Sequence, residues 1–141
     1  MATAAIPSTD VLGHVDGTIV VVGLGSIGRG FLPLLRRHLT CSRLVVIDAV
    51  DREADRLIAE RDYGAQFLQV NIGAHNYVNV LGPLLREGNS NGFLVNLAVS
   101  LNAVALMRLS RECGAMYIDT DSDMWPEDFE VRCMKSFIIE Q

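Results

Sequence analysis

Three glycines and a serine near the start of the chain have the spacing of a phosphate-binding turn. The run Gly23-Leu-Gly25-Ser-Ile-Gly28 matches G-x-G-x-x-G. The first glycine allows a tight turn, the second lacks the Cβ that would keep a pyrophosphate away, and the third lets a helix pack closely on the preceding strand. The N–H groups and the positive dipole end of that helix attract phosphate. We expect Ser26 to cap this helix, with donation to a phosphate as the alternative.

A carboxylate stands at the matching distance from this turn. Asp48 follows Gly28 by 20 positions and closes the apolar run 44–47. A carboxylate there accepts hydrogen bonds from ribose hydroxyls and repels a 2′-phosphate, so the pattern predicts a dinucleotide site that prefers NAD to NADP. The alternative is an aspartate that only begins the next turn. Arg52, four residues further on, leaves some tolerance for NADP open.

The elements that would position these residues alternate along the chain. Short apolar runs predict strands over 18–22, 44–47, 67–70, 93–99 and 116–118, and helical patterns lie between them, over 27–39, 51–62, 76–86 and from 104 to about 114. This alternation is typical of βαβ units and a parallel sheet. Right-handed crossovers then predict an α/β fold, a Rossmann-type doubly wound sheet of about five strands in the order 3-2-1-4-5. The run 137–139 is a candidate for a short sixth strand.

Details of the helices follow from the same patterns. We expect Leu57 and Ile58 to face the core, and Gly64 to end their helix in a left-handed conformation. Pro33 lies inside the first predicted helix, where it removes one backbone hydrogen bond and favours a kink.

Length and composition bound the remaining possibilities. The 141 residues suit one domain, which we divide into a flexible leader over 1–16, an NAD-binding domain over 17–125 and a divergent tail over 126–141. The net charge of −5 and the lack of a basic cluster argue against a nucleic-acid partner. No apolar run approaches the roughly 18 residues that span a bilayer, so we expect no membrane partner. Three separated cysteines and three scattered histidines predict no metal site and reduced thiols in the cytoplasm.

Polar residues also follow the fourth and fifth strands. Ligands of this fold bind outside the carboxyl ends of strands 1 and 4, so we expect Asn96 and Ser100 near the nicotinamide end of the cofactor. Capping of the next helix by Ser100 or Asn102 is the alternative. Asp123 and Trp125 place an acid beside an aromatic ring, which suits a cationic amine. On the residues alone, a solvated acidic loop with a packed tryptophan is favoured.

A longer run makes the pattern more specific. Residues 23–30, followed by Leu-Pro-Leu-Leu at 32–35, resemble the N-terminal part of the homospermidine synthase family, within the saccharopine-dehydrogenase-like group. Collinear similarity at 44–48, 92–97 and 115–120 extends the resemblance over about residues 12–125. The resemblance assigns cofactor-binding positions to Gly23, Gly25, Ser26, Ile27, Gly28 and Asp48. It also aligns Asp123-Met-Trp125 with a Glu-Pro-Trp run that contacts the polyamine, with a carboxylate shorter by one methylene.

The resemblance implies an activity as well. The family makes homospermidine from putrescine or spermidine: NAD removes a hydride from an amine-bearing carbon, ammonia leaves, a second amine attacks, and the hydride is returned. The family's chains carry a second domain, so we expect this chain to be a truncated form that is inactive alone, and we assign no catalytic residue. A fragment of a saccharopine- or carboxyspermidine-type dehydrogenase, or a stand-alone NAD-binding module, are the alternatives. An uncovered fifth-strand edge predicts a homo-oligomer.

Overall fold

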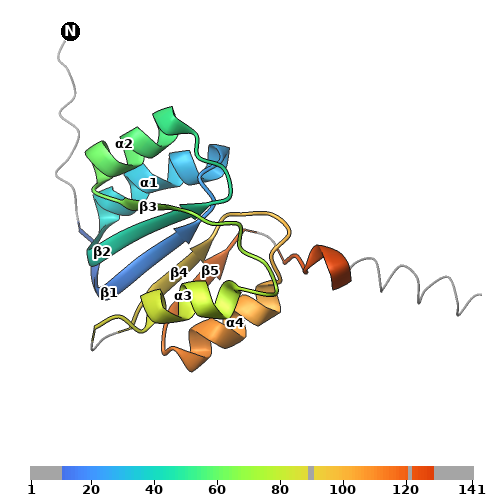
Figure 1. The fold of residues 1–141 in the computed structure, drawn as a ribbon. Coiled ribbons are helices and arrows are strands. Elements are labelled where there is room, and N and C mark those ends of the chain that lie inside the picture. The colour runs from blue at the N-terminus through green and yellow to red at the C-terminus, as the bar shows by residue number, and fades with distance from the viewer. Residues whose placement is uncertain (1–10, 89–90, 121, 129–141) are drawn as a thin grey trace, which may run out of the picture.

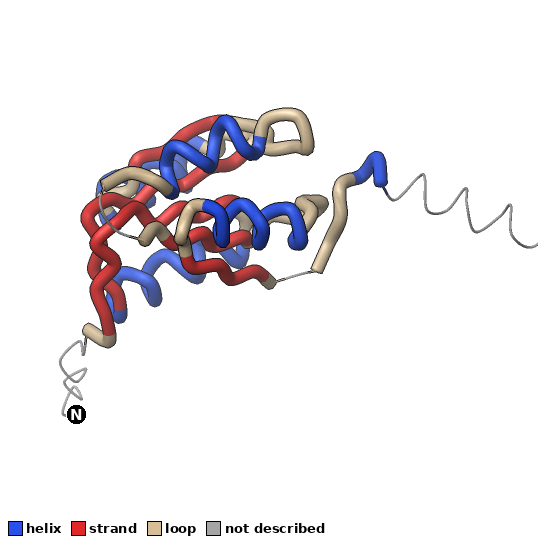
Figure 2. The backbone as a smooth tube through the Cα atoms, turned by 90° about the horizontal axis from the view of Figure 1, so that it is seen from below, coloured by secondary structure: helices blue, strands red, loops and turns tan. Residues whose placement is uncertain are grey.

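The computed structural model describes residues 11–88, 91–120 and 122–128. It contains a five-stranded parallel sheet in the order β3-β2-β1-β4-β5, which confirms the predicted topology. The strands are β1 (Gly13–Val22), β2 (Leu39–Asp48), β3 (Gln66–Gln69), β4 (Phe93–Asn96) and β5 (Met116–Asp119). The helices are α1 (Ser26–His38), α2 (Glu53–Tyr63), α3 (Tyr77–Leu85) and α4 (Ala103–Glu112). Figures 1 and 2 show α1 and α2 on one face of the sheet and α3 and α4 on the other, the arrangement of a doubly wound α/β fold.

The sheet separates two hydrophobic layers. In β1, Ile19 and Val21 pack toward α1 and α2, whereas Val20 and Val22 pack toward α3 and α4. All four side chains are at most 3% exposed. Because successive residues of a strand point to opposite faces, a strand covered on both sides must be apolar without interruption. This explains the unbroken run at 18–22.

The two central strands are longer than the sequence pattern predicted. β1 begins at Gly13 and β2 at Leu39, and these two residues are paired in the parallel ladder. A register irregularity between Val15 and Thr18 separates this extension from the main ladder. The expected leader over 1–16 is therefore wrong for residues 13–16, because backbone pairing with a distant strand fixes them although their side chains lack an apolar run. Residues 1–10, and the candidate strand at 137–139, lie outside the described residues.

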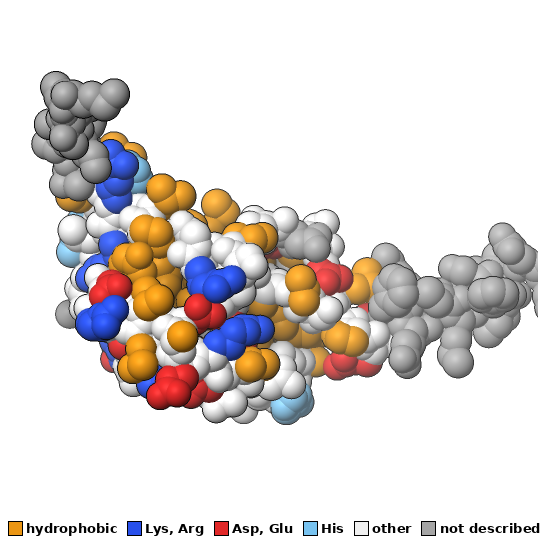
Figure 3. Space-filling model, turned by 90° about the horizontal axis from the view of Figure 1, so that it is seen from above, with side chains coloured by type: hydrophobic (Ala, Val, Ile, Leu, Met, Phe, Trp, Pro, Cys, Tyr) orange, Lys and Arg blue, Asp and Glu red, His pale blue; other side chains and the backbone are white. Residues whose placement is uncertain are grey.

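The helices confirm two predictions and overturn one. Gly64 ends α2 with a φ of 65°, in the predicted left-handed conformation. Pro33 lies inside α1, as expected. Leu57 and Ile58 are 46% and 43% exposed, however, and the buried residue of α2 is Ala59. α2 is mostly polar, so two adjacent apolar residues could not set which side of the helix meets the sheet. Figure 3 shows hydrophobic side chains among charges of both signs on the face seen from above.

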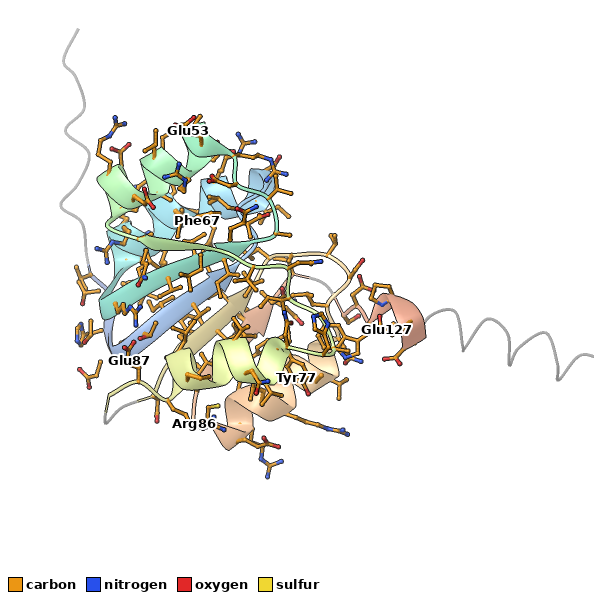
Figure 4. The ribbon with its side chains drawn as sticks, in the orientation of Figure 1. Glu53, Phe67, Tyr77, Arg86, Glu87 and Glu127 are labelled. Carbon is orange, nitrogen blue, oxygen red and sulfur yellow. The ribbon has the colours of Figure 1, made fainter. Side chains whose placement is uncertain are left out.

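A polar group ties the elements together at the amino-terminal end of the sheet. Glu87, just beyond α3, accepts hydrogen bonds from the Thr18 hydroxyl of β1 at 2.8 Å and from the Arg43 guanidinium of β2 at 2.6 Å. The Arg43 contact, more than that of Thr18, lowers the pKa of the Glu87 carboxyl below its usual value. Figure 4 shows Glu87 at this end of the sheet, away from the carboxyl ends of the strands. The opposite end is left for the functional site.

The segment after β5 packs back onto the domain through one aromatic side chain. Trp125 is 7% exposed and its ring centroid lies 5.3 Å from that of Tyr77 on α3. Figure 4 shows Tyr77 at the end of α3 nearest the segment that carries Glu127. The packed tryptophan favoured by the residues alone is confirmed, and Trp125 joins the segment after β5 to the core.

We expect Trp125→Ala to lower the free energy of unfolding by about 3–5 kcal/mol, because it removes a large ring from the core. Urea unfolding followed by circular dichroism measures the effect. Val99→Ala, at a side chain that is 76% exposed, is the control and should change stability by less than about 0.5 kcal/mol. A cost for Trp125→Ala as small as that of the control would contradict the core role.

Candidate dinucleotide-binding site

A cleft of about 460 Å³ opens at the carboxyl ends of β1, β2, β3 and β4. Its walls are the glycine-rich turn, the end of β2 with Asp48 and Arg52, residues 70–72 after β3, and residues 97–99 with Leu101 after β4. This is the topological switch point of the sheet, where the connections from β1 and β4 leave in opposite directions. The volume falls within the usual range of small-molecule sites.

The three glycines have different reasons to be glycine. Gly23 has a φ of +103°, and a Cβ there would lie 2.9 Å from the amide nitrogen of Ala98. A Cβ on Gly28 would lie 2.2 Å from the carbonyl oxygen of Gly23. The fold itself therefore excludes side chains at both positions. A Cβ on Gly25 would meet no atom within 4 Å, yet this residue lines the cleft, so its lack of a side chain leaves room for a ligand.

The first turn of α1 faces the cleft without a protein anion. The N-cap is Gly25, which makes no side-chain hydrogen bond, and the first turn contains no acidic residue. The predicted capping by Ser26 is wrong, because α1 begins at Ser26 itself and the cap position falls on a residue without a side chain. Ser26 and Ile27 line the cleft. The N–H groups of this turn and the positive helix dipole are thus available to a phosphate.

Asp48 bonds to the backbone of its own fold and also lines the cleft. Its Oδ2 accepts a hydrogen bond from the Leu24 N–H at 2.6 Å, and its Oδ1 accepts one from the Val50 N–H at 2.9 Å. The side chain is 14% exposed and lines the cleft. A carboxylate has about four lone-pair sites, so two bonds leave capacity for ribose hydroxyls. The Arg52 guanidinium lies 3.9 Å from Oδ2 and is half exposed.

The strand β4, which leads into the cleft wall at residues 97–99, ends earlier than predicted. β4 stops at Asn96, and residues 97–99, which were expected to continue it, form a loop along the cleft. Asn96 is 2% exposed, and its Oδ1 accepts a hydrogen bond from the Ala98 N–H at 3.2 Å. Asn96 therefore supports the cleft wall from behind rather than lining it. Asn102 caps α4 through a 3.0 Å bond from the Ala105 N–H, which confirms the capping alternative for this residue.

A tyrosine and a carboxylate lie beside Asn96 on the neighbouring strand. The Tyr117 hydroxyl donates to Asp119 Oδ2 at 2.7 Å, and Asp119 is the register partner of Asn96. Burial first, and then the Asp119 carboxylate, raise the pKa of Tyr117 well above its ordinary value. The hydroxyl therefore stays a neutral donor and fixes the Asp119 side chain at the end of β5.

The residues predicted to bind an amine lie apart from the cleft. Asp123 lines a separate hollow of about 550 Å³ beside α4, together with Asn102 and Asp128. The Trp125 ring belongs to the core, and Ser100 is exposed with its N–H bonded to Asp123 Oδ2 at 2.6 Å. The structure thus does not bring Asp123 and Trp125 together with the glycine turn.

Sequence reasoning missed part of the cleft. Residues 70–72 and 97–99 line it, although no motif marks them. The available signal was position alone, because the carboxyl ends of neighbouring parallel strands meet at one edge of the sheet.

Within the described segments, no three His, Cys, Asp or Glu side chains are grouped as a metal would require. In the same segments, no helix has the length and apolar character needed to cross a bilayer.

The parallel sheet, the glycine turn into α1 and the acidic end of β2 define a nicotinamide-dinucleotide-binding domain of the Rossmann type. The chain belongs to the saccharopine dehydrogenase NADP binding domain family, which it matches over residues 19–135. It is 47% identical over 114 residues to a homospermidine synthase of Blastochloris viridis, a match that covers 79% of this chain and 23% of that protein. For a homospermidine synthase of Mesorhizobium japonicum the identity is 46% over 118 residues, covering 82% of this chain and 24% of the relative. The predicted resemblance is confirmed, and the chain spans about a quarter of the length of these curated relatives.

We expect Gly28→Ala to lower the free energy of unfolding by about 1–3 kcal/mol, because the added Cβ forces α1 away from the end of β1. Gly30→Ala is the matched control in the same helix. Its Cβ would meet no atom within 4 Å, and the better helix propensity of alanine should raise stability by up to about 1 kcal/mol. Urea unfolding of both variants gives the comparison, and equal effects would refute the close-packing role of Gly28.

Proposed function

We propose that this domain binds NAD in preference to NADP, as the cofactor-binding part of an enzyme of the homospermidine synthase type. The observation that carries the preference is the Asp48 carboxylate, which lines the cleft at the end of β2. A 2′-phosphate placed beside it would meet a like charge, whereas ribose hydroxyls would find acceptors. Arg52 at 3.9 Å offsets part of this repulsion, so the preference is one of degree.

The cofactor fits the groups present in the cleft. The pyrophosphate would lie at the first turn of α1, over Gly25 and beside Ser26 and Ile27. The adenosine ribose would bond to Asp48, and the nicotinamide half would lie along the loop after β4. There Asn96 and Ser100 act through the backbone that they hold rather than by direct contact.

The reaction we propose for the complete enzyme is the formation of homospermidine from putrescine or spermidine. NAD, when bound, supplies the acceptor for a hydride from an amine-bearing carbon and later the donor that returns it. The residues of this chain orient the dinucleotide, and Leu97 and Val99 give the cleft an apolar wall. We propose that this domain alone does not complete the reaction, since it spans about a quarter of the length of the relatives named homospermidine synthase.

A stand-alone dinucleotide-binding module is the second candidate. It is favoured by the cleft being complete within the described residues, with all four walls supplied by this chain. Two incubations with NAD and putrescine separate the two candidates. One contains the chain alone, and the other contains the chain together with the remaining portion of a relative. Homospermidine formed only in the mixture supports the first candidate.

We also propose a cytoplasmic location, which the free thiols of Cys41 and Cys113 support.

Calorimetric titration of the chain with NAD and NADP tests the cofactor proposal. We expect NAD to bind more tightly than NADP. Asp48→Asn removes the charge, so we expect the preference for NAD over NADP, measured as the ratio of the two dissociation constants, to fall by about 10-fold. Gly25→Ala should leave the unfolding free energy nearly unchanged and weaken both ligands about 10-fold or more, because its Cβ fills space meant for phosphate.

The ratio of the two dissociation constants is the decisive quantity. Asp48→Asn also loses one of the two side-chain oxygens that accept backbone N–H groups, and this weakens the glycine turn for either ligand. Asp62→Asn is the matched control, since it removes the same charge from an exposed ion pair with Arg61 outside the cleft. An unchanged ratio in Asp48→Asn would refute the assignment of Asp48 to the ribose. Absence of binding of either dinucleotide to the folded chain would overturn the function.

We propose further that the domain self-associates through the bare side of β5. This edge strand pairs with β4 alone among the described strands, and its Met116 and Ile118 side chains are 48% and 52% exposed. Ile118 is the register partner of Val95, which faces the α1 and α2 layer, so these side chains lie beyond the cover of those helices. An uncovered apolar edge invites pairing with another chain.

We expect light scattering to show a dimer or larger species, and Ile118→Lys to shift it toward monomer by placing a charge on the edge. Val78→Lys, at a 45% exposed position on α3, is the control and should leave the association unchanged. A monomer at every accessible concentration of the unmodified chain would contradict this proposal.

A further inference from the structure

The loop between β4 and α4 is held in an unfavourable backbone conformation at one residue. Ser100 has a φ of +61° and is the only non-glycine residue in the described segments with a positive φ. This conformation is sterically unfavourable for an L-residue, because the Cβ comes too close to the following carbonyl oxygen. Its neighbours Val99 and Leu101 both line the dinucleotide cleft. The conformation of Ser100 therefore sets how two residues of the cleft wall are presented.

Asp123 supplies the contacts that hold this conformation. Its Oδ2 accepts a hydrogen bond from the Ser100 N–H at 2.6 Å, and its backbone carbonyl accepts one from the Ala103 N–H at 3.1 Å. Its other oxygen, Oδ1, accepts a bond from the Met124 N–H at 2.9 Å and so fixes the orientation of the carboxylate. Hydrogen bonds to a charged acceptor are roughly twice as strong as neutral ones. One aspartate thus fastens both halves of the loop to the segment after β5.

That segment is itself anchored in the core. Trp125, two residues beyond Asp123, is 7% exposed and packs against Tyr77 of α3. The position of the Asp123 carboxylate is therefore fixed by the same layer of side chains that covers the sheet, and a continuous set of contacts runs from α3 through Trp125 and Asp123 to the cleft wall at Ser100.

We propose that Asp123 is a positioning residue of the dinucleotide cleft, which holds Ser100 in the left-handed conformation and keeps the wall formed by residues 97–101 ready for the ligand. The proposal rests on the dinucleotide site of the proposed function. It differs from the amine-binding role predicted for Asp123, because both carboxylate oxygens already accept backbone N–H groups. Without this carboxylate, Ser100 relaxes to a negative φ, and Val99 and Leu101 move with it.

A double-mutant cycle on NAD binding tests the proposal. We expect Asp123→Ala to weaken NAD binding by about 10-fold, since it removes a charge-assisted hydrogen bond that supports the wall. Ser100→Gly is the second member of the cycle, and its own NAD affinity is the reference from which the loss in the double variant is counted. Glycine adopts a positive φ without the steric cost, so the loss caused by Asp123→Ala should fall to about 3-fold or less in the Ser100→Gly background. A side chain that merely stabilised the domain would not show this rescue.

Asp128→Ala is the matched control, because Asp128 lies on the same segment and lines the same hollow, but its carboxylate accepts a 3.5 Å hydrogen bond from Asn102 and not from Ser100. It should leave NAD affinity unchanged. Equal losses from Asp123→Ala in the two Ser100 backgrounds, or no loss at all, would overturn the proposal.

Hydrogen exchange gives a readout that needs no ligand. In the free chain, Asp123→Ala should speed exchange of the amides in residues 97–101, and Asp128→Ala should not. Failure of the unmodified chain to bind NAD would refute the proposed function, and the exchange data would then decide the positioning role alone. Unchanged exchange at 97–101 in Asp123→Ala would refute that role.

Discussion

The close approach of α1 to the end of β1 is the constraint on which the site depends. A single Cβ on Gly28 would lie 2.2 Å from the Gly23 carbonyl oxygen, so the helix can start where it does only because both residues lack side chains. Gly23 in turn lies against the backbone of residues 97–98, which brings the loop after β4 to the same point. These contacts place a helix N-terminus, the end of β2 and the β4 loop around one cleft, and each of the other features of the site is arranged around them.

Asp48 supports the glycine turn and is also the residue to which we assign the proposed choice of ligand. The carboxylate accepts N–H groups from Leu24 and Val50 and also lines the cleft, so the charge proposed to select against a 2′-phosphate also stabilises the turn. This double use gives a physical reason for an acid at the end of β2 in a chain whose family is named for NADP binding. A change of cofactor preference at this residue would need a replacement acceptor for the turn.

The cleft wall after β4 is held by residues that do not themselves line the cleft. Asn96 is buried behind the wall and bonds to the Ala98 N–H, while Asp123 reaches back from beyond β5 to the Ser100 N–H. Neither residue lines the cleft, yet both fix backbone that does. Trp125 belongs to the same buried cluster as Ile72 and Leu101, which line the cleft, so the segment after β5 is joined to the cleft wall through the core.

The sequence by itself determined the sheet order, the glycine turn and the acidic partner, because hydrophobic period and glycine spacing are local consequences of strand and helix geometry. It did not determine that β1 begins at Gly13, that Leu57 and Ile58 face outward, or that the Asp123 carboxylate bonds to the Ser100 N–H. Strand ends, helix rotation and burial are decided by pairing and packing between residues far apart in the chain. The tertiary structure decides which residues line the cleft and which support its wall from behind. The sequence cannot decide this, since a buried side chain and an exposed one can have the same local sequence.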